Sequence, residues 1–401
     1  MKRREKRLAV LLAACLLLAA CAPGASAASA PALRYNADGT FRILVFADAH
    51  YSTKKSDLPK MSAFMGEALD YAKPDLVVFL GDNVTDTDEA EAVRKALGEL
   101  LAPVTQRQLK FAFIFGNHDL TDFAGFDFDD TAARETLLAM YQDIPGCLTA
   151  PENPKNPGFS SYHLPIYSGK NAKKLVSNLW FFDSGGYRFE NLTFIREFVK
   201  QAQVDWYLDA SRRLEQENGG KPVPSLAFQH IMVQQLYDRF PQLPVEIPFL
   251  TEDILGSYRL VLPDFLEIND RLQGVPQPSR QRDTEFEAWT QRGDIFAAVF
   301  GHHHSNGFTV RESGVDLMNI PTVNFSNAYA SNINRGAALF TLRESAPRSY
   351  IKEDITYHQL AALPGSKIGG ANPVGGLFGG LITLLETGVY SMVYFWEGIW
   401  D

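Results

Sequence analysis

The chain has 401 residues, of which 46% are hydrophobic and 21% are charged, so it can bury a sizeable core and does not have the composition of a disordered protein. We expect one large domain or two of moderate size. The formal net charge is -9, and the charged residues among the first seven contribute +4 of it, so a chain without them would carry -13. This acidic balance disfavours a nucleic-acid backbone as the main partner.

Residues 1–20 have the layout of an export signal peptide, with a basic cluster followed by an apolar run from Leu8 to Ala20. At its end, Leu18-Ala19-Ala20-Cys21 resembles the bacterial lipobox, in which the cysteine is lipidated and becomes the new N-terminus. Lipidated Cys21 would hold the protein outside the cytoplasm at the cell membrane, and residues 21–35 would form a lipoprotein-type tether. The alternative is ordinary secretion, with cleavage after Ala25-Ser26-Ala27.

The sequence contains three cysteines, Cys15, Cys21 and Cys147. If Cys15 leaves with the signal peptide and Cys21 is lipidated, Cys147 has no partner within the chain. We therefore expect no disulfide framework and no thiolate metal ligands.

Short apolar runs rich in β-branched and aromatic residues begin near Tyr35, and their length and composition predict strands buried on both faces. Two stretches between the early runs, Lys60 to Tyr71 and Glu89 to Leu101, have apolar residues at helical spacing. Alternating strands and helices predict an α/β architecture. The predicted strands are Phe41 to Ala47, Leu76 to Leu80, Phe111 to Phe115, Leu179 to Phe182, Leu226 to Phe228 and Ile295 to Phe300.

Polar residues of metal-ligand type come directly after five of these six strands. Because sites in open α/β sheets form beyond the carboxyl ends of strands, we expect these five loops to meet. Two cations held close together need hard oxygen and imidazole ligands and one shared carboxylate, for which Asp82 is the natural candidate. Any one of these residues alone would more often be structural, so the prediction depends on the set: Asp48 and His50, Asp82, Asn117, His230, and His302 to His304.

In chain order, the motifs resemble those of the calcineurin-like metallophosphoesterase family, and the resemblance covers about Phe41 to Leu342. It implies an α/β fold with a central β-sandwich of mixed sheets flanked by helices, in a metallophosphoesterase domain at residues 36–363. It also implies two divalent or trivalent metal ions, which iron, manganese and zinc all fit. The implied ligands are Asp48, His50, Asp82 and His304 for the first ion, and Asp82, Asn117, His230 and His302 for the second.

The same resemblance gives His118 no metal and turns it towards the substrate, with Asp119 positioned to orient or charge-stabilise its imidazole. The implied reaction is hydrolysis of a small-molecule phosphate ester, in which a metal-bound hydroxide attacks phosphorus and His118 assists the leaving group. Phosphomonoesters and phosphodiesters both remain open, because the pocket loops at Thr121 to Asp130 and Pro151 to Pro157 carry no readable motif.

Three further stretches resemble the branch of the family that contains plant and fungal purple-acid-phosphatase-like proteins. They are Leu179 to Gly185, the helix around Val204-Asp205-Trp206, and Arg335-Gly336-Ala337. His303 departs from this branch, which usually has Asp there. Purple acid phosphatases have an iron-ligating Tyr three residues after the bridging Asp, where this chain has Thr85.

Four other candidates are interpreted as structural. His163 and His358 lie in strand-like stretches, Asp183 is expected in a turn, and His303 should point away from its two neighbours in an extended segment.

Residues 364–401 form a Gly-rich, apolar C-terminal tail. The stretch from Gly375 to Trp396 is long enough to span a bilayer, but Glu386 at its centre disfavours that. Membrane contact by the tail is therefore the weaker interpretation, behind packing on the domain or loose order. For the protein as a whole, the alternatives to an enzyme are a non-catalytic metal-binding surface lipoprotein and a catalytically silent membrane-associated scaffold.

Overall fold

The computed structural model describes residues 32–52, 58–85, 89–119, 131–151, 160–190, 193–239, 242–245, 251–254, 257–260, 278–279, 281–304, 306–325 and 335–368. The predicted signal peptide, Cys21, most of the predicted tether, the loop at 121–130, residues 152–157 and the tail from residue 369 lie outside them. Within the described ranges, no helix has both the length and the apolar character needed to cross a membrane.

A five-stranded mixed sheet carries the first three ligand loops. Its strand order is β17-β16-β2-β3-β4. The strands β2, β3 and β4 are parallel, whereas β16 runs antiparallel to both β2 and β17. The bounds are Thr40–Phe46 for β2, Leu76–Leu80 for β3, Phe111–Ile114 for β4, Gly336–Arg343 for β16 and Tyr350–Thr356 for β17.

A seven-stranded mixed sheet carries the remaining ligand loops, with the order β1-β5-β6-β9-β13-β15-β14. The strands β6, β9, β13 and β15 are parallel, and β5 and β14 are antiparallel to their neighbours. The bounds are Leu33–Arg34 (β1), Tyr162–Tyr167 (β5), Leu175–Phe182 (β6), Ser225–Gln229 (β9), Ile295–Phe300 (β13), Phe308–Glu312 (β14) and Val315–Asn319 (β15).

Two smaller sheets accompany these. One is the hairpin of β7 (Tyr187–Glu190) and β8 (Thr193–Arg196), and the other joins β10 (Gln242–Leu243), β11 (Thr251–Ile254) and β12 (Ser257–Leu260).

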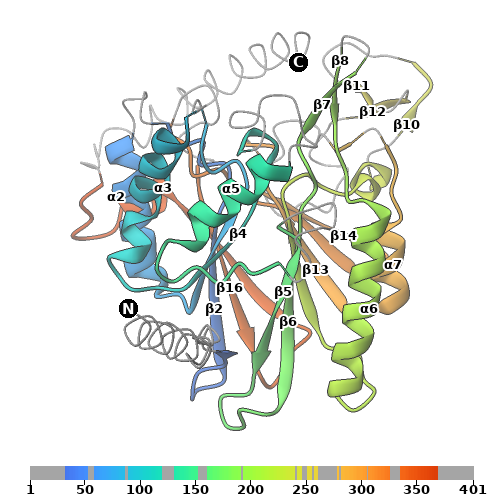
Figure 1. The fold of residues 1–401 in the computed structure, drawn as a ribbon, viewed down its shortest axis with the longest axis horizontal. Coiled ribbons are helices and arrows are strands. Elements are labelled where there is room, and N and C mark those ends of the chain that lie inside the picture. The colour runs from blue at the N-terminus through green and yellow to red at the C-terminus, as the bar shows by residue number, and fades with distance from the viewer. Residues whose placement is uncertain are drawn as a thin grey trace, which may run out of the picture. The chain divides into compact units, whose positions relative to one another are not determined.

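Helices cover the outer faces of both large sheets (Figure 1). The helices α2, α3 and α5 lie on the side of the five-stranded sheet, and α6 and α7 lie on the side of the seven-stranded sheet. Their bounds are Leu58–Ala72 (α2), Ala90–Thr105 (α3), Thr131–Gln142 (α5), Gln201–Glu217 (α6) and Glu285–Arg292 (α7), with a 3₁₀ helix η1 at Gln234–Arg239 and a short α8 at Tyr357–Ala361.

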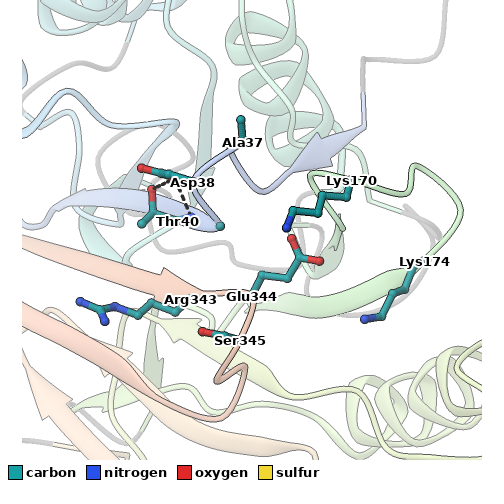
Figure 2. Close-up of a pocket in the computed structure, with 9 residues that line it drawn as sticks. Ala37, Asp38, Thr40, Lys170, Lys174, Arg343, Glu344 and Ser345 are labelled. Atoms are coloured by element: carbon teal, nitrogen blue, oxygen red, sulfur yellow. Dashed lines mark hydrogen bonds between the residues drawn. The ribbon is translucent and has the colours of Figure 1, made fainter.

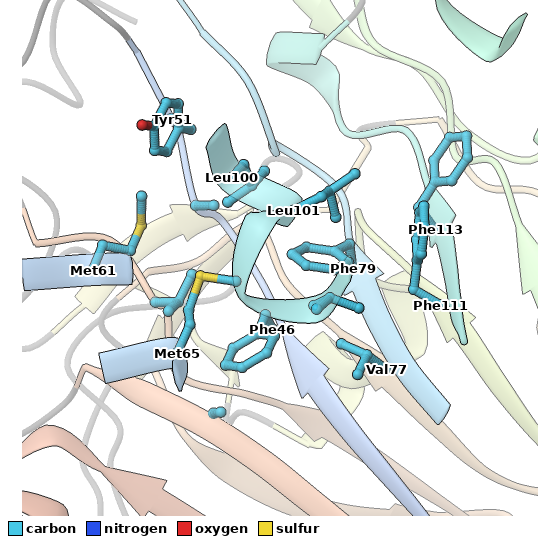
Figure 3. Packing of buried hydrophobic residues seen from close by; sticks show 14 of the residues in the cluster. Phe46, Tyr51, Met61, Met65, Val77, Phe79, Leu100, Leu101, Phe111 and Phe113 are labelled. Carbon is cyan, nitrogen blue, oxygen red and sulfur yellow. The ribbon is translucent and has the colours of Figure 1, made fainter. Parts of the chain in front are cut away.

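The strands β3, β4, β6, β9 and β13 are buried on both faces, which explains their apolar sequences. Figure 3 shows Phe46 of β2 and Phe79 of β3 packed against side chains of α2 and α3, including Met65 and Leu101. Val45 points to the opposite face of β2 and is equally buried. The predicted α/β fold with a central sandwich of mixed sheets flanked by helices is confirmed.

One local prediction is wrong. His358 lies in α8 and not in a strand, because Thr356 and Gln359 form a capping box that begins a helix directly after β17.

Candidate metal centre

Five loops from both large sheets meet at the predicted site. The first three follow β2, β3 and β4 of the five-stranded sheet, and the other two follow β9 and β13 of the seven-stranded sheet. They bring together the expected side chains: Asp48 and His50, Asp82, Asn117, His230, and His302 and His304.

The first group of ligand-type atoms comes from Asp48, His50, Asp82 and His304, whose candidate donor atoms all lie within 4.8 Å of one another. Nε2 of His50 is 3.0 Å from Nε2 of His304 and 3.5 Å from Oδ2 of Asp82. Nε2 of His304 is also 3.5 Å from Oδ1 of Asp48. These residues are the set that the resemblance implies for the first ion.

The second group comprises Asp82, His230 and His302, again within 4.8 Å. Nε2 of His230 lies 3.2 Å from Oδ2 of Asp82 and 3.1 Å from Oδ1 of Asn117. Asp82 is therefore common to both groups, as a bridging carboxylate must be.

The residues fit a pair of cations. Carboxylate oxygens, an amide oxygen and imidazole nitrogens are a donor set that suits zinc, manganese and iron. Oδ2 of Asp82 is buried and makes no hydrogen bond within the described part of the chain, although it lies between the Nε2 atoms of His50 and His230. The protonated imidazole of His230 supplies the positive charge that this buried oxygen needs, and a bound cation would take over that role.

Electrostatics favours the metal-binding form of His50, His302 and Asp82 but the protonated form of His230. Burial lowers the pKa of His50 and of His302 well below the usual value, so both imidazoles are neutral and hold a lone pair. Burial alone would raise the pKa of Asp82, but the charges of His230 and His118 outweigh it and hold that pKa well below its usual range. Burial would likewise lower the pKa of His230, but the Asp82 carboxylate raises it to about 9.

Four of the seven ligands have a left-handed backbone. Their φ angles are 52° at Asp48, 42° at His50, 49° at Asp82 and 69° at His302. This conformation costs an L-residue about 1–2 kcal/mol, so neighbouring contacts must hold the loops in place. Two of these contacts join the first two loops directly, with His50 N–H donating to Asp82 O at 2.7 Å and Asp48 N–H donating to Gly81 O at 3.1 Å.

A second set of contacts braces the loop after β2 from a segment distant in sequence. The Thr322 hydroxyl donates to the carbonyl of Asp48, and the Asn324 amide donates to the carbonyl of Ala49, both at 2.8 Å. Arg335 in turn donates through Nε to the carbonyl of Asn324 at 2.9 Å. Apart from the family resemblance around Arg335, nothing in the sequence predicts these hydrogen bonds to the loop after β2.

Two motif glycines are explained by close approach of a ligand from another loop. A Cβ at Gly116 would lie 2.2 Å from Oδ1 of Asp82. A Cβ at Gly81, whose φ is +84°, would lie 2.6 Å from Nδ1 of His230. The space that a side chain would occupy at each position is already filled by a ligand.

His118 lies beside the ligands without belonging to either group. Its backbone N–H donates to Oδ1 of Asp82 at 2.8 Å. Its half-buried ring lies 5.0 Å from the ring of His50 and 6.0 Å from that of Tyr187, measured between centroids. The backbone of His118 is thus tied to Asp82, and its partly exposed imidazole lies beside the ring of His50.

The contacts of Asp119 differ from the imidazole pairing that was expected. Oδ1 accepts the backbone N–H groups of Asn83 at 2.8 Å and Val84 at 3.0 Å, and Oδ2 accepts that of Gly116 at 2.9 Å. Asp119 therefore ties together the loops after β3 and β4. Its burial, together with the charge of Asp82, raises its pKa to about 7.

Two residues at the centre were missed by sequence reasoning. Tyr187 and Arg196 are register partners in the β7–β8 hairpin, and Nε of Arg196 lies 3.1 Å from Nε2 of His302. Apolar and polar residues alternate in parts of 187–196, which could predict a hairpin. No motif in this stretch indicates that the hairpin lies beside the metal-ligand residues.

The residues interpreted as structural lie outside both ligand groups. His163 on β5 lies 3.0 Å from the amide of Asn178 and packs against Trp180. Asp183 accepts the N–H of Gly185 at 2.9 Å, which confirms the predicted turn. His303 is neutral because burial lowers its pKa to about 3.

A separate hollow of about 470 Å³ lies at the other end of β2 (Figure 2). It is lined by residues around the start of β2 and the end of β16, including Asp38, Thr40, Lys170, Arg343 and Glu344. Because the ligands follow the opposite end of β2, this hollow does not belong to the metal centre.

Comparisons with known proteins agree with this geometry. The family model described as calcineurin-like phosphoesterase matches residues 41–306, a span that contains all seven ligand-type residues. "Probable inactive purple acid phosphatase 29" of Arabidopsis thaliana is 28% identical over 331 residues, which are 76% of this chain and 76% of that protein. Phosphatase DCR2 of Saccharomyces cerevisiae is 23% identical over 296 residues, which are 69% of this chain and 46% of that protein.

Among solved structures, a dimetal phosphatase from Danio rerio is similar with a TM-score of 0.47 and 12% identity, covering 79% of this chain and 99% of that one. A purple acid phosphatase from yellow lupin is similar with a TM-score of 0.41 and 12% identity, covering 83% of this chain and 58% of that one. Since the family model spans more than half of the sequence, the chain belongs to the calcineurin-like phosphoesterase family.

Proposed function

We propose that this protein is a dinuclear-metal-dependent hydrolase of small-molecule phosphate esters. The observation that carries the proposal is the pair of ligand groups that share Asp82. Two ions of iron, manganese or zinc held there would supply Lewis acidity towards the phosphoryl oxygens and an activated water near neutral pH.

We assign protonation of the leaving group to His118 and positioning of the ligand loops to Asp119. The backbone contact with Asp82 fixes His118 beside the ligand-type residues, and its ring is partly exposed. From there a protonated imidazole can donate to the departing oxygen, a role that contributes about 10²- to 10⁴-fold in other enzymes. Asp119 holds the loops that place Asp82 and His118.

The Arabidopsis relatives carry the word "inactive" in their names, which concerns those proteins. Here all seven ligand-type residues are present and their loops converge. His118 beside these residues has no part in either ligand group, and its presence supports turnover over the alternative of a non-catalytic metal-binding surface lipoprotein.

The test is a paired assay on purified protein of known metal content. Wild type loaded with iron, manganese or zinc is assayed with p-nitrophenyl phosphate and bis(p-nitrophenyl) phosphate, beside a chelator-stripped sample and Asp82→Asn. We expect two ions per chain and turnover that both controls lack. Two bound ions without turnover above the controls would establish the non-catalytic alternative.

We also propose that the protein is exported and anchored to the cell membrane through lipidated Cys21. The support is the lipobox-like Leu18-Ala19-Ala20-Cys21 at the end of the apolar run. Contact of the C-terminal tail with the membrane is a weaker, secondary proposal based on its apolar composition.

A further inference from the structure

The β7–β8 hairpin brings one cationic side chain to the edge of the second ligand group. Nε of Arg196 donates to Nε2 of His302 at 3.1 Å. The guanidinium carbon lies 5.7 Å from the centroid of the Tyr187 ring, within the range of a cation–π contact. The end of the strand is fixed by Ser279, whose hydroxyl donates to the carbonyl of Arg196 at 2.8 Å.

This contact and metal binding by His302 exclude each other. A neutral imidazole has a single lone pair, so when Nε2 accepts from Arg196 the proton is on Nδ1 and no lone pair remains for a cation. If a metal takes Nδ1 instead, Nε2 carries the proton and cannot accept. Whichever nitrogen binds the ion, Nε–H of Arg196 must give up His302 as its acceptor and turn to another acceptor beside the centre.

The acceptor that a phosphoesterase site provides is a phosphoryl oxygen. Guanidinium groups match phosphate geometry through two parallel hydrogen bonds. Resting on the proposed function, we infer that Arg196 is a phosphate-recognition residue that makes this site prefer phosphomonoesters to phosphodiesters, with Tyr187 as the residue that positions its guanidinium.

The preference follows from the four substituents of phosphorus. If the ions bound two oxygens and the leaving group faced His118, one substituent would remain, and the inference assigns it to Arg196. In a monoester this substituent is a charged oxygen that a guanidinium can bind. In a diester it is an ester oxygen with a second organic group, which has less charge and must fit against Arg196 and Tyr187.

The experiment compares Arg196→Met with Arg212→Met as the matched control. Arg212 lies on α6, is exposed and pairs with Asp209 at 2.9 Å, so its loss removes the same charge away from the centre. Measurements are metal content, calorimetric binding of orthophosphate to the metal-loaded protein, and kcat/KM for p-nitrophenyl phosphate and bis(p-nitrophenyl) phosphate.

For Arg196→Met we expect unchanged metal content and orthophosphate binding weakened about 10- to 100-fold, the usual effect of losing a charge-assisted hydrogen bond. The monoester kcat/KM should fall by a similar factor, and the diester value by less than about threefold. Arg212→Met should match wild type. Unchanged orthophosphate binding, or equal losses for the two esters, would overturn the inference.

Two further variants separate recognition from structure. Arg196→Lys keeps the charge without the planar fork, so its orthophosphate affinity should fall between wild type and Arg196→Met. Tyr187→Phe should retain that affinity, whereas Tyr187→Leu should lose part of it. If wild type hydrolyses neither ester, the proposed function fails, and the orthophosphate measurements still decide the role of Arg196.

Discussion

The backbone N–H of His118 donates to Oδ1 of Asp82 at 2.8 Å, while Oδ2 of the same carboxylate faces His50 and His230. One side chain therefore connects both ligand groups and also fixes the residue assigned to the leaving group. Mutations of Asp82 and His118 should consequently differ in kind.

Asp82→Asn removes the bridging negative charge, so metal content should drop and activity should fall for every ester, whatever its leaving group. His118→Asn keeps the backbone N–H and all seven ligands, so metal content should stay at the wild-type level. Its activity should fall more for alkyl phosphates than for p-nitrophenyl phosphate, because a high-pKa alkoxide needs a proton to leave. Elemental analysis and kcat for both ester types test this. If His118→Asn slowed alkyl phosphates and p-nitrophenyl phosphate equally, His118 would not act as the acid.

Gly116→Ala should be among the most damaging small changes in the chain. The new Cβ would lie 2.2 Å from Oδ1 and 2.3 Å from the backbone nitrogen of Asp82, so the loops after β3 and β4 must separate. We expect loss of metal and a lower melting temperature. Gly98→Ala on α3, where a Cβ meets no atom within 4 Å, is the control and should be neutral or slightly stabilising. A metal-loaded Gly116→Ala protein would contradict this account of the motif glycine.

Metal uptake should depend on pH through His230. Burial lowers its pKa and the Asp82 carboxylate outweighs this, raising the pKa to about 9. Below that pH a metal must displace the His230 proton, so apparent affinity should rise by up to about tenfold per pH unit between pH 6.5 and 9. Competition with a chromophoric chelator measures this slope, and a flat profile would contradict it.

The raised pKa of His230 also makes the folding stability of metal-stripped protein depend on pH. The folded pKa of His230 exceeds its unfolded value, so its contribution is complete below about pH 6.5 and is lost as pH rises through about 9. The melting temperature of stripped wild type minus that of stripped His230→Gln should therefore decrease over this range.

Thr322→Val should weaken the centre without touching a ligand. The change keeps the shape of the side chain but removes the hydroxyl that donates to Asp48 O and accepts from Asn324 N–H. Leaving buried groups unsatisfied costs about 1–3 kcal/mol, which chemical denaturation should detect together with weaker metal binding. Thr290→Val on α7 is the control, since the Thr290 hydroxyl bonds only within its own helix among the described residues. An unchanged metal affinity in Thr322→Val would show that the brace is dispensable.

Cys21→Ser should release the protein from membranes of the producing cells if the lipobox interpretation is right. Fractionation and mass spectrometry of the mature N-terminus measure this directly. A wild-type protein that is fully soluble after export, or that begins at Ala28, would instead establish ordinary secretion.

The strands that precede the ligands could be predicted from sequence because they are buried on both faces and so read as uninterrupted apolar runs, as Leu76–Leu80 and Ile295–Phe300 do. The contacts of Asp119 could not be predicted from its place beside His118. Residues 117–119 are helical, and adjacent residues in a helix project about 100° apart. Arg196 and Thr322 also escaped prediction, because each reaches the centre only through packing of segments far apart in the chain.

The division of the ligand-type residues between two sheets has a consequence for when the protein can bind metal. Nε2 of His50 and Nε2 of His304 meet at 3.0 Å although 254 positions separate them. The five-stranded sheet supplies Asp48, His50, Asp82 and Asn117, and the seven-stranded sheet supplies the rest, so neither half alone can complete either ligand group. Metal capture must therefore be a late event in maturation. If the chain is exported unfolded, as the proposal for residues 1–21 implies, the ions available outside the cytoplasm would determine which metal the protein binds.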